Sequence, residues 1–377
     1  MKSNVKIYKT ASIFILGMLL LTSCNNNPVP ILENTFDTNG LKVITYGVNK
    51  GVLGKNTSIG TTIATFTDQQ AYDNYMGSLD QQIEVWDNAF VARWSQLDDD
   101  AINAKEAELN FDSEKPLTDF ENSVGLQSLR QKYLAEESVW LNNDVLDETT
   151  DPDDNPEYDF DDSEKALLNV NSEVQIGTDI YKQLNSGQIS AINGVMQKFA
   201  GQKGTIITDV VAGSYLKIAQ TDYTSLIKFN DGDMSIIGQK NVSVVSPNTA
   251  LECKYGKSKR AWFETVPNSK KIRAVVKVPQ PRWGANGKVK AKIKSFKKSG
   301  HSWKKYRTNL YVGLEGLVYN TRCDFPSNSI NTGKSDRKKK LVFIWYDFNF
   351  DSHVVENGGM KGIFKQDGIT KELILSW

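Results

Sequence analysis

Histidines and recognised catalytic motifs are scarce in this sequence. It has only two histidines, His301 and His353, and it contains no HExxH, GxSxG or glycine-rich phosphate-loop motif. His301 lies in the polar stretch 299–302, an ordinary place for a surface histidine. We therefore predict no catalytic residue and expect a non-enzymatic protein. A glycan hydrolase with a pair of carboxylates stays open as an alternative, because folding rather than sequence spacing brings such a pair together.

Acidic residues are dense between positions 144 and 164, where eleven Asp and Glu occur without one Lys or Arg. Four polar residues of this stretch fall at positions 1, 3, 5 and 12 of a calcium-loop template: Asp151, Asp153, Asn155 and Asp162. The sixth position is Pro156 instead of glycine, and the twelfth lacks the usual glutamate. The stretch therefore has two interpretations, a Ca²⁺ site or a solvated, self-repelling acidic loop. We expect no other cofactor.

Aromatic residues next to cations in the C-terminal third are the best candidates for binding a ligand. The candidate residues are Trp283, Trp303, Lys304, Lys305, Tyr306 and Arg307. A tryptophan in a loop can stack on a sugar ring while neighbouring cations meet a carboxylate, sulfate or phosphate. The alternative is that Trp303 anchors a core and the lysines are solvated. Anionic lipid is as natural a partner as a glycan, whereas nucleic acid is not expected, since no recognised reader module is present.

The charge of the chain is unevenly distributed, although its formal net charge is zero. Residues 1–250 hold 18 Lys and Arg against 35 Asp and Glu, a net charge of −17. Residues 251–377 hold 27 against 10, a net charge of +17. We expect two regions with different surfaces that attract each other where they are adjacent.

Hydrophobic periodicity predicts an α+β N-terminal part with a helical segment and a mostly β C-terminal domain, for which a β-sandwich is favoured. One apolar series predicts an amphipathic helix that buries two tryptophans: Ile83, Trp86, Phe90, Trp94 and Leu97. A short strand is predicted at 225–229, and Asp231-Gly232 between the segments 227–229 and 234–236 predicts a β-hairpin. Between Val289 and Lys294, apolar and basic residues alternate, which predicts a strand with one face in the core and a row of lysines in water.

The N-terminus combines three lysines, an apolar run from Ile13 to Leu21 and the sequence Leu21-Thr22-Ser23-Cys24. The run is too short to span a bilayer, and no later segment approaches the ~18 to 20 apolar residues of a membrane helix. Leu-Thr-Ser-Cys resembles the lipobox of bacterial lipoproteins. This resemblance implies cleavage before Cys24, acylation of that cysteine and a membrane partner through the lipid anchor. The alternative is an ordinary secretory signal with a chance cysteine.

The two remaining cysteines, Cys253 and Cys323, would lie outside the cytosol, where disulfides persist. A bridge between them would close a loop of about 70 residues and stabilise the fold by roughly 4 kcal/mol on the chain-entropy model. The alternative is a pair of buried free thiols, because sequence does not give their separation. We predict the disulfide.

Two further stretches carry a resemblance: Gly125 to Arg130, and Leu167 to Tyr181 with its Glu173-Val174-Gln175-Ile176-Gly177 core. Both are similar to a family of uncharacterised secreted lipoproteins from Bacteroidota. The resemblance implies a cell-envelope location, with lipid anchoring in the outer membrane facing the periplasm or the cell surface. It implies no known activity.

The predicted organisation has five parts: a signal peptide (1–23), a tether (24–40), an α+β and helical region that ends in the acidic loop (41–164), a β-rich middle segment (165–250) and a basic all-β domain (251–377). The sequence favours a lipid-anchored envelope protein that binds an anionic or glycan ligand. A structural or assembly subunit that works through a protein partner, and the glycan hydrolase, remain the alternatives.

Overall fold

The computed structural model describes residues 40–46, 61–198, 210–220, 222–246, 257–279, 283, 288–319, 326–346, 354–355 and 360–375. These residues lie in one unit of the chain, Thr38–Trp377. Cys24, Cys253 and Cys323 lie outside the described residues, so lipidation and the disulfide stay predictions. None of the helices in the described part is both long and apolar enough to cross a membrane.

The first sheet has six strands in chain order: β1 (Leu41–Tyr46), β2 (Thr61–Phe66), β3 (Glu173–Ile176), β4 (Asp179–Gln183), β5 (Tyr215–Ala219) and β6 (Val242–Val245). Neighbouring strands are antiparallel except β2 and β3, which run parallel. Helices α2 to α6 lie between these two strands in the sequence, although the strands are neighbours in the sheet. The sheet therefore joins segments on both sides of residue 164.

Helix α7 (Ser186–Lys198) and helix α8 (Tyr223–Asn230) contribute side chains to the core of this sheet. The hairpin predicted around Asp231-Gly232 is wrong, because 223–230 and 234–236 are helical. The Asp222 side chain accepts a hydrogen bond from the backbone amide of Ser225 and caps α8, while Leu226 and Phe229 bury one helical face. Asp231 and Gly232 end the helix instead of turning a hairpin.

The helical segment contains α2 (Gln69–Arg93), α3 (Asp99–Glu108), α4 (Lys115–Val124), α5 (Leu129–Leu141) and α6 (Asp162–Leu167). Helix α2 covers most of the predicted amphipathic helix but ends at Arg93, before Trp94 and Leu97. Of the predicted apolar series only Phe90 is buried, and the two predicted core tryptophans are half-buried. The Trp86 indole donates a hydrogen bond to the carbonyl oxygen of Asp112 at 2.8 Å. Gly125 ends α4 with φ of 64°, a left-handed conformation that glycine adopts without strain.

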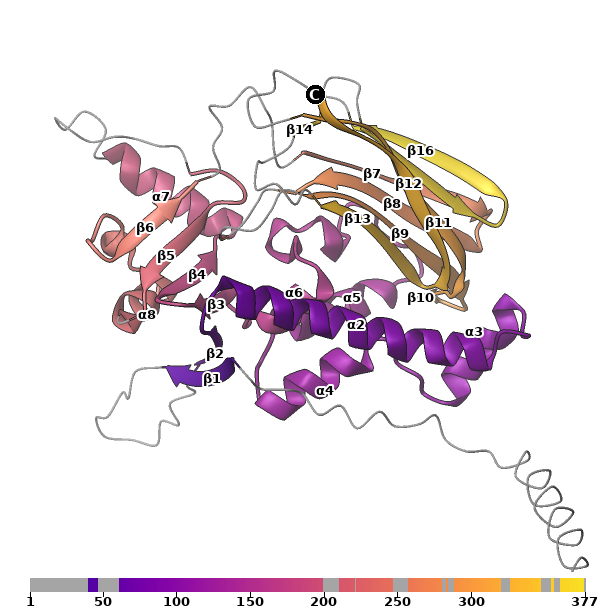
Figure 1. Cartoon of the computed structure of the whole chain (residues 1–377), viewed down its shortest axis with the longest axis horizontal. Coiled ribbons are helices and arrows are strands. Elements are labelled where there is room, and N and C mark those ends of the chain that lie inside the picture. The colour runs from indigo at the N-terminus through magenta and orange to yellow at the C-terminus, as the bar shows by residue number, and fades with distance from the viewer. Residues whose placement is uncertain are drawn as a thin grey trace, which may run out of the picture. The chain divides into compact units, whose positions relative to one another are not determined.

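The C-terminal region consists of two five-stranded antiparallel sheets (Figure 1). One contains β7 (Lys257–Val266), β8 (Lys270–Val278), β9 (Lys288–Ser299), β10 (Ser302–Lys305) and β13 (Lys340–Tyr346). The other contains β11 (Thr308–Tyr319), β12 (Pro326–Lys338), β14 (Val354–Val355), β15 (Met360–Gln366) and β16 (Ile369–Leu375). Both contribute to one apolar core, in which Ile293, Val312 and Phe364 are fully buried. This confirms the mostly β domain, and the shared core is that of a sandwich.

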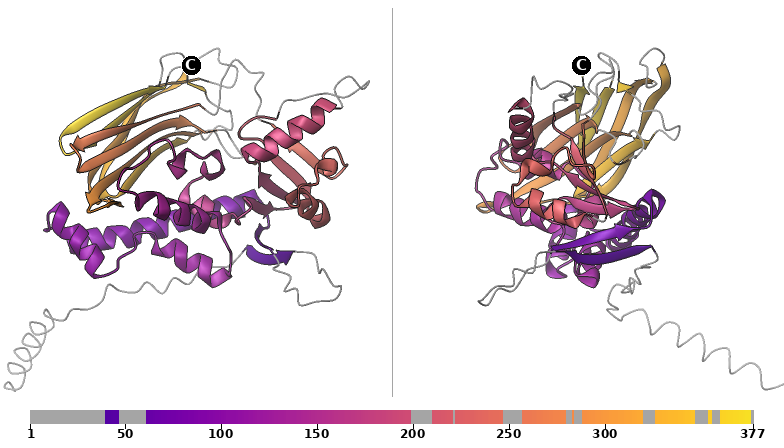
Figure 2. Two further views of the ribbon diagram at one scale, coloured as in Figure 1. Left: turned by 180° about the vertical axis from the view of Figure 1, so that it is seen from behind. Right: turned by 90° about the vertical axis from the view of Figure 1, so that its left-hand side faces the viewer.

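The helical segment lies along the outer face of the sheet that holds β8, β9 and β13, as both Figure 1 and Figure 2 show. Asn103 of α3 donates to and accepts from the backbone of Arg307, which lies between β10 and β11. Lys294 of β9 pairs with Glu137 of α5 at 3.0 Å. The basic domain and the acidic helices are therefore in direct contact, as their opposite charges predict.

Candidate functional site

Strand β9 places a row of lysines on the helical side of its sheet. Val289, Ala291 and Ile293 enter the sandwich core, so the lysines between them point the other way. The prediction that these lysines lie in water is wrong, since Lys290 and Lys294 are each only 4% exposed. Helices and the acidic segment cover them.

The acidic stretch 144–164, which we call the acidic segment, packs against this basic face. Asp153 contacts Arg273 at 2.9 Å, Lys292 at 3.0 Å and Lys294 at 2.7 Å. Arg273 also pairs with Asp151 at 2.5 Å. Burial would raise the pKa of Asp153, but Lys292, Lys294 and Arg273 hold that pKa well below its usual range.

The prediction of a solvated acidic loop is therefore wrong. Residues 152–158 form two single-turn helices, η1 (Pro152–Asp154) and η2 (Pro156–Tyr158), and α6 follows them. Farther along, Asp159 pairs with Lys277, and Asp161 pairs with Lys288 at 3.1 Å. Cations from β8 and β9 offset the repulsion that would otherwise extend the segment.

The four residues of the calcium template do not share one ligand set. Asp151 and Asp153 both face Arg273, whereas the Asn155 side chain accepts a hydrogen bond from the backbone amide of Glu157. Asp162 pairs with Lys165 at 3.4 Å and also with Lys340. Within the described residues, no group of three or more His, Cys, Asp or Glu is arranged to hold a metal ion. The cations that meet these acids are the protein's own side chains, and calcium binding stays a prediction.

Two of the six predicted ligand residues lie inside the interface between helices and sheet. Trp303 is 5% exposed, packs with Trp140 and Phe296, and donates its indole hydrogen bond to the carbonyl oxygen of Asp144 at 3.1 Å. This favours the alternative in which Trp303 anchors a core. Arg307 is fully buried and bridges Asp87 and Glu106 at 2.5 and 2.6 Å, respectively.

Trp283 is a third predicted ligand residue that is buried. It is 5% exposed and lies among the rings of Tyr72, Phe160 and Tyr181, with centroid separations of 5.7 to 6.0 Å. These rings belong to α2, the acidic segment and β4. Trp283 therefore contributes to packing between segments that are far apart in the sequence.

The other three predicted ligand residues, Lys304, Lys305 and Tyr306, line one pocket of about 400 Å³. We call it the lysine pocket, and its charged lining consists of Lys297, Lys298, Lys304, Lys305, Lys339, Asp100 and Glu106. The rings of Tyr306 and Phe111 also line it. Five lysines against two carboxylates give the lining a positive charge.

Most of these lysines already have internal partners. Lys339 pairs with Glu106 at 2.8 Å, and Lys305 pairs with Glu137 at 2.6 Å. Lys304 is exposed and makes no ion pair within the described residues. It is thus the charge best placed to meet a ligand.

Tyr306 forms one wall of the lysine pocket. Its hydroxyl donates a hydrogen bond to Asp100 at 2.9 Å, and the amines of Lys270 and Lys297 lie 4.7 and 5.1 Å from its ring centroid. Burial and the Asp100 hydrogen bond raise the pKa of Tyr306, so its hydroxyl stays neutral at physiological pH.

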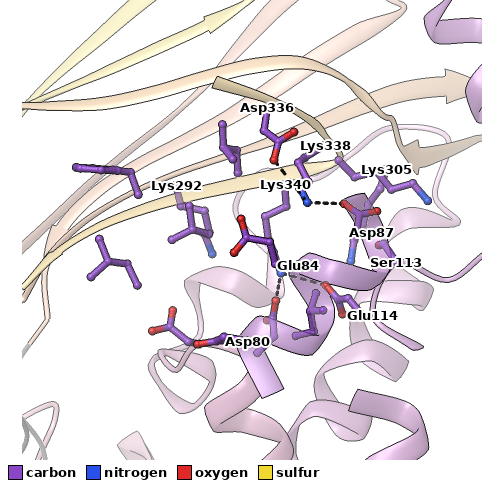
Figure 3. A pocket seen from close by; sticks show the side chains of 18 of the residues that line it. Asp80, Glu84, Asp87, Ser113, Glu114, Lys292, Lys305, Asp336, Lys338 and Lys340 are labelled. Atoms are coloured by element: carbon purple, nitrogen blue, oxygen red, sulfur yellow. Dashed lines mark hydrogen bonds and ion pairs between the residues drawn. The ribbon is translucent and has the colours of Figure 1, made fainter. Parts of the chain in front are cut away.

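A second pocket, of about 730 Å³, lies between α2 and β13 (Figure 3). We call it the mixed-charge pocket, and it is defined by Asp80, Glu84, Asp87, Lys334, Lys338 and Lys340. Its full lining has eight acidic and eight basic side chains, and it shares Lys305 and Lys339 with the lysine pocket.

Sequence reasoning missed the acidic wall of this pocket. Asp80, Glu84 and Asp87 are spaced by four and three residues, so they share one face of α2. An acidic stripe at helical spacing was the available signal. On the opposite wall, burial together with neighbouring Lys292 lowers the pKa of Lys290 to about 7. Burial also lowers the pKa of Lys292 to about 7.

The comparisons with known proteins give little similarity. No protein-family model and no curated protein matches the chain. Among solved structures, the chain is similar to the crystal structure of a DUF4848 family protein from Bacteroides thetaiotaomicron VPI-5482. The two chains are 11% identical, the match covers 89% of this chain and 100% of that chain, and the TM-score is 0.19. A TM-score this low shows neither the family nor the fold.

Proposed function

We propose that this protein is a lipid-anchored, non-enzymatic component of the cell envelope that binds an anionic ligand in the lysine pocket. The ligand class is a glycan or lipid that carries a phosphate, sulfate or carboxylate group. The observation that carries the proposal is the lining of the pocket, in which five lysines face two carboxylates beside two aromatic rings.

The internal ion pairs leave a specific place for the ligand charge. Glu137 and Asp144 neutralise Lys305 and Lys298 but do not line the pocket. The surface that a ligand meets is therefore more positive than the cluster as a whole. An anion would contact Lys304 without having to break an ion pair within the described residues, while Phe111 supplies apolar ring surface. Tyr306 is only 4% exposed, so its ring supports the wall of the pocket from behind.

Replacing Lys304 by glutamate tests the pocket. On an array of glycans and lipids, we expect labelled wild-type protein to bind anionic members and Lys304→Glu to lose at least about tenfold in affinity, since an attraction becomes a repulsion. Lys259→Glu is the matched control, because Lys259 is an exposed lysine on β7, outside the pocket. It should bind as the wild type does.

Two outcomes would contradict the proposal. Equal binding by Lys304→Glu and wild type would remove the pocket from the binding function. Uniformly negative arrays for the wild type would favour the assembly subunit instead.

The lipid anchor is tested separately through Cys24. When the full-length chain is expressed in a bacterial host with labelled palmitate, the wild type should take up label and remain in the membrane fraction. Cys24→Ala should lose both, because only the cysteine thiol and its new amino group accept acyl chains. Several acyl chains hold a protein far more firmly than one, so the change in fractionation should be nearly complete. Labelling that persists in Cys24→Ala would place the acylation elsewhere.

A further inference from the structure

The mixed-charge pocket has walls of opposite charge. One wall comes from α2, which carries Asp80, Glu84 and Asp87, and the other comes from β12 and β13, which carry Lys338 and Lys340 (Figure 3). Acidic and basic side chains are equal in number over the whole lining, in contrast to the lysine-rich lining of the neighbouring pocket. A purely anionic ligand would therefore meet repulsion from the α2 wall.

Some of the charges on the two walls are already paired. Asp87 pairs with Lys338 at 2.8 Å, and Lys340 pairs with Glu114 at 3.0 Å. These contacts hold the walls together and leave little net charge for a ligand.

Exposed charges on both walls are outside these ion pairs, and Asp80 is one of them on α2. Glu84 and Lys334 are both exposed, and the described residues offer neither of them an ion pair. The pocket thus presents the carboxylates of Asp80 and Glu84 on one wall and the amine of Lys334 on the other to any molecule that enters.

We propose that the mixed-charge pocket binds a small zwitterionic ligand, a molecule with one amine and one carboxylate or phosphate group. The ligand amine would lie at Glu84 on α2, and its anionic group would lie at Lys334 on the lysine wall. The volume of about 730 Å³ suits such a molecule, since small-molecule sites commonly measure about 300 to 1,000 Å³.

The test compares two probes that differ in the amine, O-phosphoethanolamine and inorganic phosphate, by isothermal titration calorimetry at pH 7. Wild-type protein should bind O-phosphoethanolamine more tightly than phosphate. Glu84→Gln should lower the affinity for O-phosphoethanolamine by about fivefold, the value of one exposed charge pair, and should not weaken phosphate binding, because it removes a negative charge. Glu108→Gln, an exposed glutamate on α3 outside both pockets, should change neither affinity.

Three results would overturn the proposal. The wild type could show no preference for O-phosphoethanolamine, or it could bind neither probe at 10 mM (about the weakest useful affinity). Glu84→Gln could also lose affinity for both probes equally. Lys334→Ala gives a second variant, which should weaken both probes at this pocket. Lys304→Glu separates this site from the lysine pocket, because it should leave the preference for the amine unchanged. Loss of that preference in Lys304→Glu would place the amine in the lysine pocket and overturn the assignment.

Discussion

Replacing Asp153 by asparagine is expected to lower the free energy of unfolding by about 3 to 5 kcal/mol, the usual cost of breaking a buried ion pair from one side. Asp153 is buried and meets Arg273, Lys292 and Lys294. The variant removes the counter-charge of Lys292 and one of the counter-charges of Arg273 and Lys294, which keep Asp151 and Glu137, respectively. The substitution preserves size, so the loss measures charge rather than a cavity. Urea unfolding followed by tryptophan fluorescence measures it as a lower midpoint at an unchanged m-value.

Asp119→Asn is the matched control for this variant. Asp119 forms a partly exposed pair with Lys115 one helical turn away on α4. Such pairs contribute about 0.3 to 0.5 kcal/mol, so the control should unfold almost as the wild type does. A loss under about 1 kcal/mol in Asp153→Asn would show that the acidic segment does not dock on β8 and β9 in solution.

The attraction between the two halves of the chain could be predicted from the sequence, but its location could not. Counting charges gives −17 before residue 251 and +17 after it, and the structure places these charges in contact. A run of acids without Lys or Arg looks self-repelling when only its neighbours in the sequence are considered. Its counter-charges, such as Arg273 and Lys294, lie more than 100 residues away, and only the fold brings them together.

Strands and helices with a clear local sequence pattern were predicted correctly, whereas those that depend on tertiary contacts were not. Strand β9 alternates apolar and basic residues strictly, so it was predicted, although the helices that cover its lysines were not. Strand β12 was missed because it is polar almost throughout and places Ile330 in the core through pairing with β11. Helix α8 is short and has apolar residues on adjacent positions, which imitates a strand until the cap at Asp222 is considered.

The candidate site was predicted in part for similar reasons. Aromatic residues beside cations drew attention to 303–307, and the structure places Lys304, Lys305 and Tyr306 in one pocket. The sequence does not show which aromatic rings are buried, and Trp303 proved to be in a core. Pockets form between segments, so the acidic wall from α2 had no local signal beyond its helical spacing.

Acid should destabilise the protein through Glu137, and the effect should disappear in Glu137→Gln. Burial alone would raise the pKa of Glu137, but Lys294 and Lys305 outweigh burial and lower that pKa to about 2 from an ordinary value of 4.5. Because the folded-state pKa is depressed, the stabilisation is fully present above the unfolded-state value and is lost as the pH falls towards 2. The shift corresponds to about 3 kcal/mol, of which about 2 kcal/mol should be lost between pH 5 and pH 3.

Urea unfolding at several pH values from 6 down to 3 tests this linkage. Wild type should lose about 2 kcal/mol more than Glu137→Gln between pH 5 and pH 3, because glutamine does not titrate. Exposed Glu108→Gln should keep the slope of the wild type. Asp151 acts in the opposite direction, since burial raises its pKa and its protonation in acid favours the folded state. The comparison of variants cancels that contribution, so equal slopes for wild type and Glu137→Gln would mean that Lys294 and Lys305 do not hold this carboxylate ionised.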